Sequence, residues 1–159
     1  MEAIVRMMTR MDPKGLCQLL GLQPLPLEGG FYRETYCSED PSATAIYYLL
    51  TPETHSALHR LPGDELYHFY LGDPVEMLIL EEGKGELRTL GCDIEKGIFP
   101  QVLVPGEAWQ GSRLKEGGAF ALMGTTMSPG FSFDQYEAGD STKLAREYPA
   151  FASFISSIQ

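Results

Sequence analysis

The sequence predicts an all-β fold: a single antiparallel β-barrel, or jelly roll, with a short N-terminal helix and C-terminal helices on the outside. Short runs of apolar, aromatic and β-branched residues follow one another between residues 45 and 127. Turn-forming residues such as Pro, Gly and Asp separate these runs. The spacing of apolar residues that is typical of helices occurs only before and after this region. Many short strands joined by tight turns favour an antiparallel barrel or sandwich.

A short helix is expected before the barrel. Asp12 and Pro13 predict its start, because aspartate caps helices well and proline suits the first helical position. Gly21 predicts its end. Pro24 and Pro26 then require an extended arm that cannot lie in the middle of a sheet.

Alternation of side chains and β-forming residues predict a series of strands. Their expected ranges are 31–37, 45–50, 55–59, 65–71, 75–80, 86–90, 101–104 and 119–127, and residues 131–136 are a candidate for one more. Residues 83–85 place two glycines around a lysine, as some phosphate-binding loops do. Neither a helix nor a Ser or Thr follows directly, so we interpret this segment as a hairpin turn.

The pattern changes to a helical one after the last strand. Asp140 predicts a helix start, and Pro149 predicts an interruption. The apolar residues that recur at helical spacing on either side of this proline are Leu144, Ala145, Tyr148, Phe151, Phe154, Ile155 and Ile158. We expect two short helices, or one kinked helix, to cover an outer face or an open edge of the sheet.

Charge and composition exclude several classes of protein. The 159 residues carry a formal net charge of -10, and no basic stripe offsets it, which disfavours nucleic acid as a partner. The cysteines Cys17, Cys37 and Cys92 do not form a disulfide pattern and are expected to be partly buried free thiols. No apolar run approaches the ~20 residues that a transmembrane helix needs, and no signal peptide is evident. We expect a cytoplasmic protein with no membrane partner: a poorly ordered leader at residues 1–11 and a single domain at 12–159.

The most informative stretch joins two predicted strands. His59 ends one strand and Glu65 begins the next, so the turn between them brings both side chains to one mouth of the barrel. An imidazole and a carboxylate can act as general acid and base, or can bind a metal. Glu65 shares a strand face with Tyr67 and Phe69. We therefore expect His68 to face away as a structural histidine.

These residues resemble the motifs of the cupin superfamily. The first cupin motif has two histidines one residue apart, a glutamate a few residues later and a glycine after six more. His59, Glu65 and Gly72 match it, with one extra residue before the glutamate. The second motif, a proline and a glycine followed by a histidine, is similar to residues 105–110, where Gln110 takes the place of the histidine.

More closely, the chain resembles the uncharacterised cupin subfamily five, a domain of unknown function whose fold is similar to that of dTDP-sugar epimerases. The similar segments extend over most of residues 15–150 and are residues 28–36, 45–50, 59–72, 104–110 and 128–131. The resemblance implies a cupin barrel without a settled activity. It also implies a homodimer, in which the arm before Phe31 is expected to add a strand to the partner's sheet.

A metal site of the superfamily type would use three histidines and a glutamate, and this sequence departs from that pattern. The first histidine of the motif is missing, and His55 and His68 are poorly placed to join His59. The remaining candidate ligands are His59, Glu65 and Gln110, which would hold a divalent metal weakly. We therefore expect no cofactor, with a weakly bound divalent metal as the alternative. Without a metal, burial is expected to raise the pKa of Glu65, which suits proton exchange with His59.

Other side chains are expected to line the same mouth of the barrel. Ser56 and Leu58 alternate with Ala57 and His59, so only one of these two pairs is expected to face inward. Aromatic residues there can stack on a sugar or a base, and arginines can receive an anionic group. The candidate ligand-binding residues are Arg33, Ser56, Arg60, Tyr67, Phe69, Trp109, Gln110 and Phe131.

Three functions are compatible with these observations. In the first, the barrel binds a small sugar-like or nucleotide-like anionic molecule, on which His59 and Glu65 perform isomerase-type or epimerase-type proton transfer. In the second, the chain is a metal-dependent oxygenase, isomerase or decarboxylase. In the third, it has a non-enzymatic binding or structural role, and the two side chains form a buried polar network.

Overall fold

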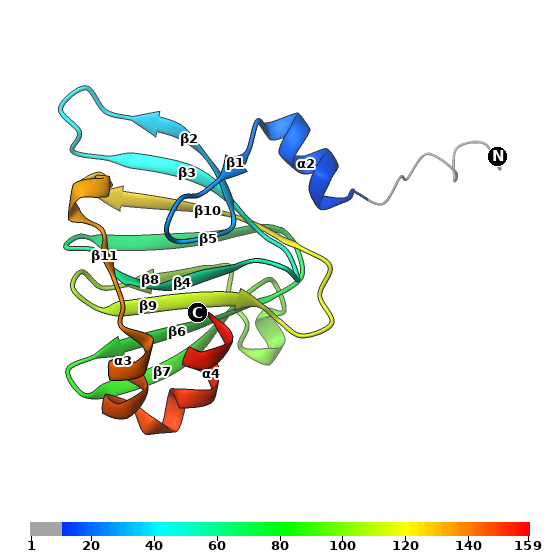
Figure 1. Cartoon of the computed structure of the whole chain (residues 1–159). Helices are drawn as coiled ribbons and strands as arrows, with labels where there is room; N and C mark the ends of the chain where they lie inside the picture. Colours follow the sequence, from blue (N-terminus) through cyan, green and yellow to red (C-terminus); the bar gives the residue numbers. More distant parts are fainter. Residues whose placement is uncertain (1–10) are drawn as a thin grey trace.

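The computed structural model describes residues 11–159, which fold into two antiparallel β-sheets with a few short helices (Figure 1). One sheet has six strands in the order β1-β2-β3-β10-β5-β8, and the other has five in the order β11-β4-β9-β6-β7. The all-β jelly roll predicted from the sequence is confirmed. Apart from Met11, the predicted leader at residues 1–11 lies outside the described residues.

Most element bounds lie close to the predicted ones. The strands are β1 Gln23–Pro24, β2 Phe31–Cys37, β3 Thr44–Leu50, β4 His55–Arg60, β5 Asp64–Gly72, β6 Val75–Glu81, β7 Lys84–Leu90, β8 Gln101–Val104, β9 Trp109–Leu114, β10 Ala121–Ser128 and β11 Glu137–Ala138. The helices are α2 Pro13–Leu20, α3 Ser141–Glu147 and α4 Ala152–Ser157, with short 3-10 turns η1 Ile94–Lys96, η2 Phe133–Gln135 and η3 Pro149–Phe151. The predicted hairpin turn between β6 and β7 is confirmed, and Glu82 and Gly83 have the positive φ angles of a tight hairpin turn.

Strand alternation divides the apolar residues between an inner core and two outer layers. In β6, Val75, Met77 and Ile79 belong to the core between the sheets, whereas Leu78 and Leu80 face outward. All five are buried. Burial of each such side chain contributes about 1.5–3 kcal/mol, so this core supplies the main stabilisation of the barrel that holds the pocket.

The N-terminal helix α2 covers the outer face of the six-stranded sheet. Its Leu16 packs with Leu49 of β3 and Leu122 of β10. The side chain of Asp12 accepts a hydrogen bond from the backbone N–H of Gly15 at 2.6 Å, and Gly21 ends the helix in the left-handed conformation. Both predicted ends of this helix are therefore confirmed.

The C-terminal helices cover the outer face of the five-stranded sheet (Figure 1). Leu144 of α3 and Ile155 of α4 pack with Leu58, Leu78 and Leu80 of the sheet. Two short helices separated at Pro149 are present, as the sequence predicts.

Three segments near the pocket differ from the prediction, and the first is β9, which carries Trp109 and Gln110 and corresponds to no predicted strand. Residues 131–136 do not form a strand; they contain the turn η2 and lead into β11, which pairs with β4 next to His59. The arm before Phe31 pairs through β1 with β2 of its own chain. Its expected role in a dimer therefore stays a prediction.

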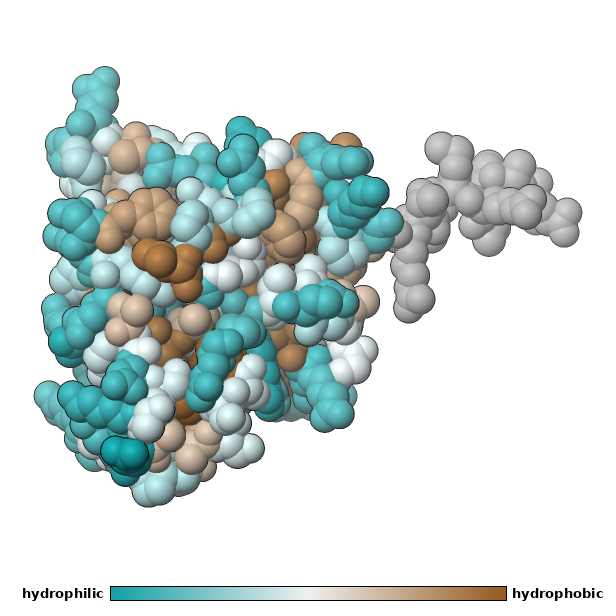
Figure 2. Space-filling view, viewed as in Figure 1, coloured by the Kyte–Doolittle hydropathy of each residue, from teal (hydrophilic) through white to brown (hydrophobic). Residues whose placement is uncertain are grey.

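The face of the molecule shown in Figure 2 carries both hydrophilic and hydrophobic residues. Hydrophilic residues dominate its outline, and hydrophobic ones are visible mainly nearer its middle. All three cysteines are free, but Cys37 and Cys92 are exposed rather than partly buried: Cys37 ends β2, and Cys92 lies in the loop after β7. Among residues 11–159, no helix is both long enough and apolar enough to cross a membrane. The cytoplasmic location stays a prediction.

Candidate functional site

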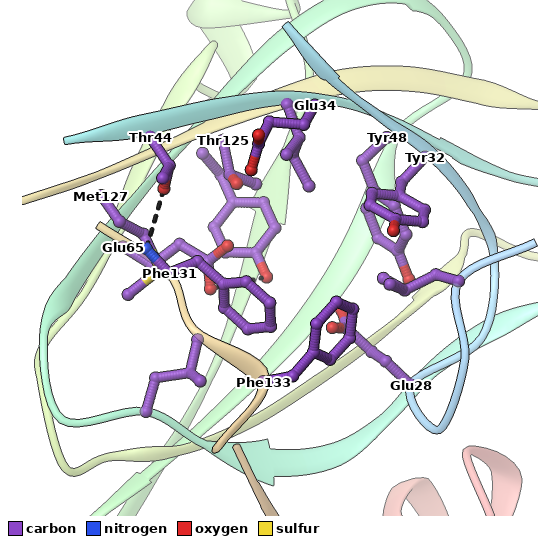
Figure 3. Close-up of a pocket in the computed structure, with 14 residues that line it drawn as sticks. Glu28, Tyr32, Glu34, Thr44, Tyr48, Glu65, Thr125, Met127, Phe131 and Phe133 are labelled. Carbon is purple, nitrogen blue, oxygen red and sulfur yellow. Dashed lines mark hydrogen bonds between the residues drawn. The ribbon is translucent and has the colours of Figure 1, made fainter. Parts of the chain in front are cut away.

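A pocket of about 170 Å³ opens into the barrel beside the loop that carries Phe131 and Phe133 (Figure 3). Strands β2, β3, β5 and β10 and the arm before β2 supply most of its walls. The lining residues are Leu25, Glu28, Tyr32, Glu34, Thr44, Ile46, Tyr48, Leu61, Glu65, Tyr67, Thr125, Met127, Phe131 and Phe133. The pocket thus combines aromatic rings with three carboxylates.

Glu65 lies at the start of β5 and is held by a buried hydrogen-bond network. The amide of Gln110 donates to Glu65 Oε2 at 2.9 Å, and the hydroxyl of Tyr67 lies 3.3 Å from the same oxygen and donates to Gln110 Oε1 at 2.8 Å. Burial, followed by the charge of Glu28, raises the pKa of Glu65, and the nearby His59 opposes this. Glu65 is therefore better suited than an exposed glutamate to hold and donate a proton.

Glu28 reaches the pocket from the arm, and two glycines make this possible. A side chain on Gly29 would lie 2.4 Å from the carbonyl oxygen of His55, and one on Gly30 would lie 2.7 Å from the ring of Tyr48. Both glycines also have positive φ angles, which other residues rarely adopt. The hydroxyl of Tyr48 donates to the carbonyl of Gly29 at 2.8 Å and fastens the arm to β3.

The imidazole of His59 lies behind Glu28. Its Nδ1 is 2.8 Å from the carbonyl oxygen of Ala57, so Nδ1 must carry a hydrogen. Its Nε2 lies 3.9 Å from Glu28 Oε2, is buried and has no hydrogen-bond partner among the described residues. The hydroxyl of Ser56 donates to Glu28 Oε1 at 2.8 Å, and the ring of Tyr136 stacks on the imidazole at 5.1 Å. A proton on either Glu28 or His59 Nε2 would allow these two groups to bond.

A β-bulge in β4 interrupts the regular alternation of side chains that the sequence predicts for this strand. Ser56 pairs with Ser112 and His59 pairs with Gln110, so β4 has one more residue than β9 between these two pairings. The bulge turns Ser56 and His59 toward the same carboxylate, whereas Leu58 packs outward under the C-terminal helices. The expectation that only one of the alternating pairs faces inward is therefore wrong.

Four predicted ligand-binding residues lie outside the pocket. Arg33 is exposed and donates to the carbonyl of Leu20 at the end of α2. Arg60 pairs with Glu137 and lies over the ring of Trp109, which itself packs beside the C-terminal helices. Phe69 packs against the inner core. Arg33, Arg60 and Trp109 thus face away from the barrel interior, whereas Phe69 faces inward but deeper than the pocket. Neither of the two predicted arginines lines the pocket.

The other predicted site residues gather at or directly behind the pocket. Glu65, Tyr67 and Phe131 line it, Gln110 bonds to Glu65, and Ser56 and His59 stand behind Glu28. His68 faces away on the outer sheet surface, where its ring contacts Thr126 and Gln101. Sequence reasoning missed Glu28, Tyr32, Glu34, Tyr48, Thr125, Phe133 and Tyr136. The two glycines that follow Glu28 are the sequence feature that could have indicated a tightly packed loop at this position.

The two sheets form a jelly roll, and a pocket inside it contains Glu65, the glutamate of the first cupin-like motif. This combination defines a cupin-type barrel. The chain belongs to the family described as Cupin superfamily (DUF985), Cupin_5, whose match extends over residues 14–139. The similarity to dTDP-sugar epimerases stays a prediction.

Known proteins with similar chains support this placement. Protein SO0799 from Shewanella oneidensis is 33% identical with a TM-score of 0.86, over 94% of this chain and 98% of that one. A hypothetical protein from Leishmania major is 28% identical with a TM-score of 0.84, over 93% and 98% of the two chains. The human prolyl 4-hydroxylase subunit alpha-3 is 31% identical over 107 residues, which are 67% of this chain but 19% of that protein. The chain thus spans about a fifth of the length of this curated relative.

The residues present do not fit the metal that a cupin of the histidine-rich type would hold. The side-chain oxygen of Gln110 already accepts from Tyr67, and Glu65 Oε2 already accepts from Gln110. His59 Nε2 faces Glu28 instead of these two groups. Among residues 11–159, no three His, Cys, Asp or Glu side chains gather as a metal-binding group. The predicted ligand set of His59, Glu65 and Gln110 is therefore committed to other contacts.

Proposed function

We propose that this cupin binds a small organic molecule in the pocket and transfers protons to and from it without a metal. The observation that carries the proposal is the contact between Glu28 and His59. Nδ1 of His59 donates to Ala57, and the buried Nε2 faces the carboxylate of Glu28 at 3.9 Å without a hydrogen bond between them. Such a pair is suited to accept a proton from a ligand.

Glu65 complements this pair as the acid. Glu28 and Glu65 line one pocket but have different surroundings, and two such carboxyl groups can divide the roles of base and acid between them. Glu28 takes a proton from the ligand, Glu65 donates a proton to it, and exchange with solvent restores both groups. The ligand leaves as an isomer, so no oxidant, reductant or second substrate is required. His59 and Ser56 do not line the pocket and act as positioning residues for Glu28.

Deuterium uptake from solvent tests this proposal. Purified protein is incubated in deuterated buffer with a panel of amino acids and sugars, and mass spectrometry follows the gain of a deuteron. We expect uptake into at least one compound, lost in Glu28→Gln and in Glu65→Gln. Glu95→Gln serves as the control, because Glu95 is exposed on η1 and far from the lining residues. Uptake that persists in both pocket variants, or its absence from the whole panel, would refute the proposal.

A further inference from the structure

We propose that the pocket takes a small organic cation, namely a primary or secondary ammonium group attached to a compact apolar body. This inference rests on the proposed function for the place of the ligand, and it adds the chemical class. It replaces the anionic sugar-like or nucleotide-like molecule that the sequence alone suggests.

The charges around the pocket favour a cation. Glu28 and Glu34 line it as carboxylates, Glu65 adds no positive charge in either protonation state, and none of the lining residues is a lysine or an arginine. In the close-up of Figure 3, Glu34 points into the pocket from β2, while Glu28 and Glu65 lie on either side of the two phenylalanine rings. The formal net charge of -10 on the whole chain adds to the negative potential, which attracts cations and repels anions.

The aromatic residues favour the same class of ligand. The five rings that line the pocket belong to Tyr32, Tyr48, Tyr67, Phe131 and Phe133. Phe131 and Phe133 meet edge to face, with ring centroids 4.9 Å apart, and so form one wall. The faces of aromatic rings carry partial negative charge and attract ammonium groups, while their area accepts an apolar body.

The hydrogen-bonding groups specify a cation that carries N–H donors. The hydroxyl of Tyr48 already donates to Gly29, and the hydroxyl of Tyr67 already donates to Gln110. The ionised carboxylates of Glu28 and Glu34 can only accept. The remaining lining hydroxyls, those of Tyr32, Thr44 and Thr125, can accept as well as donate. A primary or secondary ammonium therefore has several acceptors for its hydrogens here, whereas a quaternary one has no hydrogens to offer.

The environment of Glu28 independently indicates a missing donor. Ser56 donates to its Oε1, but no hydrogen bond from a described residue reaches its Oε2. The nearest group is the buried and unpartnered Nε2 of His59, 3.9 Å away. An ammonium group on the pocket side would supply the hydrogen bond that this oxygen lacks.

A series of three probes of similar shape tests the proposal. Benzylamine, benzyl alcohol and benzoate have a positive, zero and negative charge, and their binding to the full chain is measured by calorimetry and by NMR shifts of the pocket residues. We expect benzylamine to bind about tenfold more tightly than benzyl alcohol, because the charge adds cation–π and ion-pair attraction. Benzoate is expected not to bind. Equal affinity for the alcohol, preference for benzoate, or no saturable binding of benzylamine at millimolar concentration would overturn the proposal.

A matched pair of variants locates the binding. Glu34→Gln lies at the exposed edge of the pocket and is expected to weaken benzylamine about threefold while leaving benzyl alcohol unchanged. Glu95→Gln, which makes the same change far from the pocket, is expected to leave both affinities unchanged. Equal loss in the two variants would mean a general charge effect and would overturn the site.

The failure of this inference and that of the proposed function are distinguishable. Selective binding of the amine without deuterium exchange would leave the cation site standing and refute proton transfer. Deuterium exchange into neutral compounds, without preference for the amine, would refute the cation site and support proton transfer.

Discussion

His59 Nε2 and Glu28 Oε2 lie 3.9 Å apart in a buried position, although the two residues come from a strand of one sheet and from an arm at the edge of the other. The separation is too long for a direct hydrogen bond. Because Nδ1 of His59 donates to Ala57, a hydrogen bond between His59 and Glu28 requires a proton on either Nε2 or the Glu28 carboxyl group. The stability and the chemistry of the pocket should both respond to changes at Glu28.

Replacement of Glu28 by alanine and by glutamine should have different effects on stability. Glu28→Ala leaves the buried hydroxyl of Ser56 without its acceptor and should lower the free energy of unfolding by about 1–3 kcal/mol. Glu28→Gln keeps an acceptor for Ser56 and places an N–H toward His59, so it should be at least as stable as the wild-type protein. Urea denaturation measures both, with Glu95→Ala as control. Equal losses in the two Glu28 variants would show that the glutamine amide does not bond to Nε2 of His59.

Glu65 should make stability depend on pH in a definite direction. Its pKa in the folded chain is raised above the ordinary 4.5, mainly by burial. A carboxyl that holds its proton more tightly when folded stabilises the fold fully below its unfolded pKa, and this contribution is lost as the pH rises through the folded pKa. The free energy of unfolding of wild-type protein should therefore fall relative to that of Glu65→Gln as the pH is raised above 4.5. Urea denaturation at several pH values measures the difference, and a constant difference would contradict this account.

The hydroxyl of Tyr67 should contribute measurably to the network around Glu65. Tyr67→Phe removes the group that contacts both Glu65 and Gln110, leaving a buried acceptor unpaired, which should cost about 1–3 kcal/mol. Tyr32→Phe is the matched control, because Tyr32 lines the same pocket but is only partly buried. Its effect should stay within about 0.5 kcal/mol. Thermal and urea denaturation should rank the two variants in this order, and a reversed order would show that the network does not stabilise the fold.

The C-terminal helix α4 should stabilise the barrel as part of its core. Ile155 is fully buried against the five-stranded sheet, so Ile155→Ala should lower the free energy of unfolding by about 2–5 kcal/mol through lost burial and the cavity left behind. The neighbouring Ser156 is exposed, and Ser156→Ala should change stability by less than about 0.5 kcal/mol. Similar small effects in both variants would indicate that α4 is not tightly packed in solution.

Metal removal should not destabilise the protein. His59 Nε2 faces Glu28, and the polar atoms of Gln110 and Glu65 bond to each other and to Tyr67. Exhaustive dialysis against a chelator should therefore leave the melting temperature unchanged, and added Mn²⁺ or Zn²⁺ should not raise it. A melting temperature that falls on dialysis and is restored by one of these ions would show that the side chains rearrange around a metal.

The regular parts of the fold were predictable because alternation and caps are local properties of the chain. The helix caps at Asp12 and Asp140, the hairpin turn at 83–85 and the outward position of His68 could all be expected from such rules. The predicted strand at 131–136 was wrong, since its aromatic residues fold over the pocket mouth as a turn.

The site was only partly predictable, because its central contact depends on irregular backbone. Alternation alone could not reveal the bulge that turns Ser56 and His59 toward one side. Glu28 lies in a loop without periodicity, so no pattern links it to a residue 31 positions further along the chain. Arg33 and Arg60 were expected to line the pocket because they lie close to the site in sequence. Their side chains instead bond to Leu20 and Glu137, outside the pocket.

The arm that delivers Glu28 is attached to the sheet edge through a β1 strand of two residues, Gln23 and Pro24. Its other ties are the buried side chain of Leu25 and a few hydrogen bonds, such as those of Glu28 with Ala57 and of Gly29 with Tyr48. The inner core does not depend on this edge, since all but one of its buried members lie on later elements. Release of the arm would therefore remove the proposed base from the pocket while most of the inner core stayed packed, and hydrogen exchange along residues 23–30 would report how often this happens.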